Sequence, residues 1–101
     1  MDERERHASY VREKLNLAAH AIRDGDKPVQ ERVLMAHRVG LSAVDRTWIP
    51  HADARDEFDA INAALTRHGP GSVSTTLWTM SDNDANSLAD RIVALADRYL
   101  A

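Results

Sequence analysis

The sequence feature that most constrains the fold is a row of apolar residues within positions 81–100. These residues recur at spacings of three and four: Ala85, Leu88, Ile92, Leu95 and Tyr99. Such spacing places the side chains on one stripe of an α-helix, and the charged residues between them fall mostly off the stripe. Ser81 occupies an N-cap position, and Asp84 can complete a capping-box-like arrangement. A stripe this apolar predicts further helices that bury it.

Length and composition indicate one globular domain over residues 1–101. The chain has 44% apolar and 29% charged residues, which is typical of a folded soluble protein. It has no cysteine, so disulfides, thiolate metal sites and cysteine nucleophiles are excluded. No signal-peptide pattern is visible, and no apolar run approaches the roughly 18–20 residues that span a bilayer. We therefore expect a cytoplasmic location without membrane contact.

The charged residues carry two further indications. Arginine outnumbers lysine eleven to two beside abundant alanine, which predicts a bacterial, GC-rich source. The formal net charge of −3 argues against general nucleic-acid binding, which favours a basic surface.

The first helix is predicted over residues 2–23. Its stripe consists of Ala8, Val11, Leu15, Ala18 and Ile22. Acidic residues occupy its start, where the helix dipole favours them. We expect Gly25 to close this helix in a left-handed conformation.

The second helix is predicted from Pro28 to Trp48. Asp26 can cap it, and a proline in the first turn costs nothing because the first N–H groups have no intrahelical partner. Gly40 would then lie inside the helix at a cost of about 1 kcal/mol relative to alanine. Such a glycine indicates close packing against another helix.

A third helix is predicted to begin at Pro50, because the residue before a proline is disfavoured in the α region. It ends before the Gly-Pro-Gly sequence at 69–71. Residues 72–80 combine β-prone residues with a spacing that also fits a helix. A lone strand would have no partner in this chain, so we predict a short helix that leads into the C-terminal one.

Together these segments predict an all-α fold. The arrangement expected is an up-and-down four-helix bundle with an additional short helix before the C-terminal helix, because short connections favour antiparallel neighbours.

Several short runs resemble small, uncharacterised bacterial all-helical proteins. These runs are Pro28-Val-Gln-Glu-Arg-Val-Leu, Phe58-Asp-Ala-Ile61 with Leu65-Thr66-Arg67, Gly71-Ser72-Val73 through Thr76-Leu77 to Met80-Ser81-Asp82, and the helix containing Arg91-Ile92. The resemblance covers most of the chain after Pro28 and implies a helical domain of unknown function. It assigns no catalytic residue.

Histidines offer the candidate ligand or metal residues. His37 and His68 lie on apolar stripes and would approach each other if the second and third helices packed antiparallel. His20 and Asp24 are one helical turn apart, a spacing that allows a shared metal ion. The alternative is that each histidine is half-buried and hydrogen-bonded, which is favoured because the Glu-x-x-His pairs of di-metal bundles are absent. No catalytic residue, metal or cofactor is predicted.

The two tryptophans are the remaining candidates for function. Trp48 and Trp78 belong either to the core or to an interface, where tryptophan is favoured because it combines a large apolar area with one donor. Leu17, Met35 and Val39 lie off the main stripes and widen the apolar surface.

This excess of apolar surface predicts a protein–protein interaction or accessory module that self-associates, most simply as a homodimer. The partner expected is another copy of the chain or another protein. One alternative is a small helical enzyme, or a ligand or metal binder, that uses histidines and acids in the bundle core. A second is a nucleic-acid-associated regulator.

Overall fold

A computed structural model describes residues 3–67, 69 and 71–100. Its elements are α1 (Glu3–Arg23), α2 (Val29–Val39), the 3-10 helices η1 (Leu41–Ala43) and η2 (Arg46–Trp48), α3 (Ala52–Leu65), α4 (Val73–Trp78) and α5 (Asp82–Leu100). Within these residues there is no β-strand, so the predicted all-α class is confirmed.

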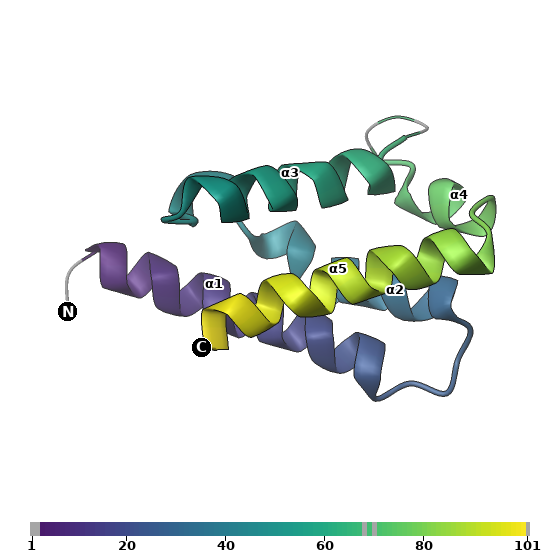
Figure 1. The fold of residues 1–101 in the computed structure, drawn as a ribbon, viewed down its shortest axis with the longest axis horizontal. Helices are drawn as coiled ribbons and strands as arrows, with labels where there is room; N and C mark the ends of the chain where they lie inside the picture. The colour runs from purple at the N-terminus through teal and green to yellow at the C-terminus, as the bar shows by residue number, and fades with distance from the viewer. Residues whose placement is uncertain (1–2, 68, 70, 101) are drawn as a thin grey trace.

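The four longer helices alternate in direction, and the N-terminal end of α1 lies at the same end of the molecule as the C-terminal end of α5 (Figure 1). Helix α5 packs against α1, α2 and α3, and α1 packs closely along α2. In Figure 1, α3 lies on the other side of α5 from α1. Alternating directions are those of an up-and-down four-helix bundle, which remains our interpretation of this arrangement.

The stripe on α5 is the centre of the core, as its spacing predicts. Its buried members are Ala85, Leu88, Ala89, Ile92, Leu95 and Ala96. The side chain of Tyr99 lies outside the described part. The predicted stripe of α1 is buried from Val11 to Ile22, and Phe58, Ile61 and Leu65 bury the matching face of α3. Each of these larger side chains contributes about 1.5–3 kcal/mol by leaving water.

The ambiguous segment at 72–80 forms the predicted short helix. Val73 and Leu77, one turn apart on α4, are both buried. Ser81 then caps the start of α5 as predicted, because its Oγ accepts a hydrogen bond from the backbone N–H of Asp84 at 3.1 Å. The helical spacing therefore outweighs the β propensity of the threonines here.

The prediction of one helix from Pro28 to Trp48 is wrong. Helix α2 ends at Val39, and two 3-10 helices follow. Asp45 is the local reason why the chain does not return to an α-helix before η2. Its carboxylate accepts hydrogen bonds from the backbone N–H of Thr47 at 2.9 Å and from the Thr47 hydroxyl at 2.7 Å. Such a bond satisfies backbone donors outside an α-helix. The close packing predicted at Gly40 is present, but this glycine ends α2 instead of lying within it.

The predicted ends around the first connection are also wrong. Gly25 has no positive φ, and α2 begins with Pro28 at its N-cap and no side-chain cap from Asp26. Arg32 ties this connection instead: its Nη1 donates to the carbonyl of Ile22 at 2.9 Å, and its Nε donates to that of Lys27 at 2.9 Å. A Cβ on Gly25 would lie 2.8 Å from Cδ of Arg32, so the glycine makes room for this side chain.

The two ends of α3 differ from their predicted positions by only a few residues. Helix α3 begins at Ala52, two residues after Pro50, and its last residue is Leu65. No helix in the described part of the chain is long and apolar enough to cross a membrane.

Candidate interaction surface

The first candidate histidine site depends on how α2 and α3 pack. His37 is half-buried on α2, and burial, assisted by the charge of the adjacent Arg38, lowers its pKa. The main contacts of α3 are with α5, α4 and η2 rather than with α2, on which the approach of His37 to His68 depended. His68 itself lies outside the described residues.

His20 and Asp24 lie at the end of α1 with 3.4 Å between Nδ1 and Oδ2, and both side chains are exposed. Across residues 3–67, 69 and 71–100, no group of three or more histidines or acids has the geometry to hold a metal ion. This pair joins the last turn of α1 to the residue that follows it, and its role as a ligand pair stays a prediction from the sequence.

Trp48 is packed within the fold. Its ring stacks on that of His7 with centroids 4.1 Å apart and an angle of 9° between planes. Tyr10 meets it edge-on at 5.5 Å, and the indole is half-buried against the core. Trp48 thus fastens η2 to the first turns of α1, a role that helical periodicity could not reveal because both partners are distant in sequence.

The large apolar side chains that remain exposed are concentrated on α1, α2 and α4. They are Leu17 (40% exposed), Met35 (43%), Val39 (37%) and Trp78 (62%). All four are interface candidates from the sequence. Trp78 is the most exposed of them, although tryptophan is otherwise highly buried on average.

Helical spacing aligns three of these residues with Ala21, and we interpret the four as one strip along α1 and α2. Ala21 and Met35 line the same hollow. Leu17 precedes Ala21 by one turn, and Val39 follows Met35 by one turn. Helices α1 and α2 run in opposite directions (Figure 1), so one turn back along α1 and one turn forward along α2 lead the same way along the two helices.

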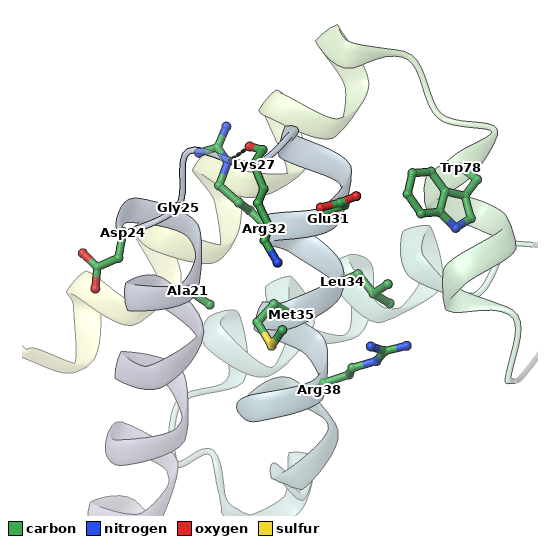
Figure 2. Close-up of a pocket in the computed structure, with 10 residues that line it drawn as sticks. All are labelled: Ala21, Asp24, Gly25, Lys27, Glu31, Arg32, Leu34, Met35, Arg38 and Trp78. Carbon is green, nitrogen blue, oxygen red and sulfur yellow. Dashed lines mark hydrogen bonds between the residues drawn. The ribbon is translucent and has the colours of Figure 1, made fainter.

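Figure 2 shows the hollow beside this strip, which has a volume of about 390 Å³. Its apolar lining comes from Ala21, Leu34, Met35 and Trp78. Helix α2 runs through the middle of the view, with α1 on one side and the Trp78 indole on the other. We call this surface, with Leu17 and Val39, the α2 face.

Charged residues surround the apolar part of the α2 face. They are Asp24, Lys27, Glu31, Arg32 and Arg38. Arg32 is held by backbone carbonyls. Glu31 and Arg38, two helical turns apart, have no hydrogen bond or ion pair through their side chains to any described residue. They lie on either side of Leu34 and Met35 along the helix.

A second hollow of about 400 Å³ lies where α1 approaches the start of α3. It is lined by Ala8, Arg12, Pro50, His51, Asp53, Ala54 and Arg98. There, Nη1 of Arg98 lies 3.8 Å from Oδ2 of Asp53, so these opposite charges form an ion pair within the fold. This hollow contains none of the candidate interface, ligand or metal residues that the sequence predicts.

Comparison with protein-family models, curated proteins and solved structures found no match to this chain. The helices and the exposed apolar side chains define an all-α protein with an apolar face. The resemblance to bacterial helical proteins stays a prediction from the sequence.

Proposed function

We propose that this protein is an interaction module that self-associates through the α2 face. The observation that carries the proposal is the gathering of its exposed large apolar side chains at α1, α2 and α4. Contiguous apolar surface with a charged rim is typical of protein-binding sites. Trp78 is the expected energetic centre, because tryptophan is enriched among residues that dominate binding energy.

Several observations favour association over catalysis. The α2 face presents alkyl, thioether and indole groups at its centre, and its charged residues lie along the rim. An apolar hollow of this kind suits a partner helix.

The proposal is tested by measuring mass against concentration. We expect sedimentation velocity to show a shift from 11.3 kDa toward twice that mass between sub-micromolar and hundreds of micromolar concentrations. Trp78→Ser and Met35→Ser should each move this transition to higher concentration without loss of helical signal. A chain that stays monomeric throughout would refute the proposal.

A matched control uses an apolar side chain that is off the α2 face. Ala94 is exposed on α5 and lines a different hollow from Met35, and Ala94→Ser should leave the transition in place. If Ala94→Ser weakens association as much as Trp78→Ser does, the contact lies elsewhere.

A further inference from the structure

We infer that the partner on the α2 face is a second copy in which the two α2 helices pack antiparallel about a two-fold axis between Leu34 and Met35. This inference rests on the proposed function, since it specifies the geometry of that self-association. It is carried by the order of charges along α2, where Glu31 and Arg38 lie at equal distances from the proposed axis.

An antiparallel two-fold arrangement pairs opposite charges. Each residue on one side of the axis faces the residue equally far on the other side, so Glu31 faces Arg38 of the partner subunit. The same contact forms a second time by symmetry. Leu34 then faces the partner's Met35 at the centre, where both are removed from water.

A parallel arrangement would instead place each charge against its own copy. Glu31 would face Glu31 of the partner subunit, and Arg38 would face the partner's Arg38. Like charges at an interface are disfavoured, whereas complementary ones fix register and partner orientation. Because Glu31 and Arg38 form no ion pair with the described residues of their own chain, both are available for the antiparallel contact.

The flanks of the α2 face fit the same symmetry. Trp78 lies beside the N-terminal half of α2, near Glu31 (Figure 2). The two-fold axis brings the partner's Trp78 beside the C-terminal half, near Arg38, where a guanidinium can lie over the indole. Each Trp78 thus covers the C-terminal half of the partner's α2, which the partner's own Trp78 leaves uncovered.

The size of the surface indicates a weak dimer. Helix α2 has 11 residues and is therefore about 16 Å long. A standard interface covers about 800 Å² on each partner, more than a helix of this length supplies alone. The strip on α1 and the Trp78 indole must contribute, and we expect a dissociation constant in the micromolar range.

The test reverses the two charges. Glu31→Arg alone and Arg38→Glu alone each replace two attractions by two repulsions, and each should weaken the homodimer about tenfold or more. An equimolar mixture of the two variants restores both contacts in a heterodimer, as does the double variant in a homodimer. Sedimentation velocity at low ionic strength should therefore show recovery of dimer in both cases, within about threefold of the wild-type constant.

Matched controls make the same charge changes elsewhere. Asp84→Arg alters an acid in the first turn of α5, as Glu31→Arg does in α2, and Arg67→Glu alters an exposed arginine after α3. Neither should change the dimer, and circular dichroism should report the same helix content for all variants.

The outcomes separate the two proposals. A dimer that Trp78→Ser weakens, but that ignores the reversals or fails to recover in the mixture, overturns the antiparallel register and leaves self-association through the α2 face intact. A wild-type chain that remains monomeric at hundreds of micromolar overturns both.

Discussion

Gly40 lies against the backbone of Lys14 so closely that a Cβ on this glycine would be 2.3 Å from the Lys14 carbonyl oxygen. The same Cβ would lie 2.9 Å from that of Ala18. Two backbones meet here, so neither side can yield by a change of rotamer. This contact sets the spacing of α1 and α2, and hence the width of the groove on which the α2 face depends.

We expect Gly40→Ala to destabilise the fold by about 1–3 kcal/mol, because overpacking forces a backbone shift. Gly25→Ala is the comparison, since its Cβ would meet the side chain of Arg32 at 2.8 Å instead of another backbone. It should cost less than Gly40→Ala, because only the two hydrogen bonds of that side chain to carbonyls are disturbed. Urea unfolding followed by circular dichroism measures both. A Gly40→Ala variant as stable as the wild type would show that the helices separate at no cost.

Thr76 is buried, and its hydroxyl has no hydrogen-bond partner among the described residues. Removing an unpartnered buried hydroxyl while keeping the shape is neutral or stabilising. Thr76→Val should therefore raise the free energy of unfolding by up to about 1 kcal/mol. The exposed neighbour Thr75→Val should change it little. A loss of stability in Thr76→Val would mean that the hydroxyl is hydrogen-bonded in solution.

The elements of this fold were predictable where one physical signal dominated. The stripe through Leu88 and Ile92 predicts α5, and the hydroxyl of Ser81 predicts where it starts. Both signals can be read within one segment of the sequence. The break after Val39 was not predictable in this way. It depends on the approach of Gly40 to another helix and on the side-chain bond of Asp45, while the apolar spacing continues across both.

The same distinction applies to the candidate surface. Leu17, Met35 and Val39 were identified because they lie off the main stripes, and they are indeed exposed. For the tryptophans, periodicity gave no answer, because burial of Trp48 depends on the ring of His7, distant in sequence. The position of Arg32 between two backbone carbonyls was likewise invisible, since arginine on a helix surface is ordinarily solvated.

The two tryptophans should differ sharply when replaced. Trp48→Ala removes a ring stacked on His7 and packed on the core, and should cost about 2–4 kcal/mol of monomer stability. Trp78→Ala removes a ring that is 62% exposed, and should change monomer stability by less than about 0.5 kcal/mol. Urea unfolding at sub-micromolar concentration measures these values without contribution from association. Equal losses in the two variants would contradict the different roles assigned to them.

His37 should make the fold sensitive to mild acid. Burial, with a smaller effect from the charge of Arg38, lowers the pKa of His37 below its ordinary value of 6.5. Well above the ordinary pKa of 6.5, the imidazole is neutral in both the folded and the unfolded chain, so there it has no effect on the pH dependence of stability. As the pH falls below this value, the unfolded chain binds the proton first, and stability is lost until the pH passes the lowered pKa.

Replacement of His37 isolates this contribution from the other titrating groups. Urea unfolding at about pH 7.5 and about pH 5.5 should show a smaller loss of stability in His37→Gln than in the wild type. Arg38→Gln should give an intermediate loss, because it removes the smaller of the two causes and leaves burial in place. Equal losses in all three proteins would mean that the imidazole is solvated in the folded chain, since only a difference in proton affinity between the two states can make stability depend on pH.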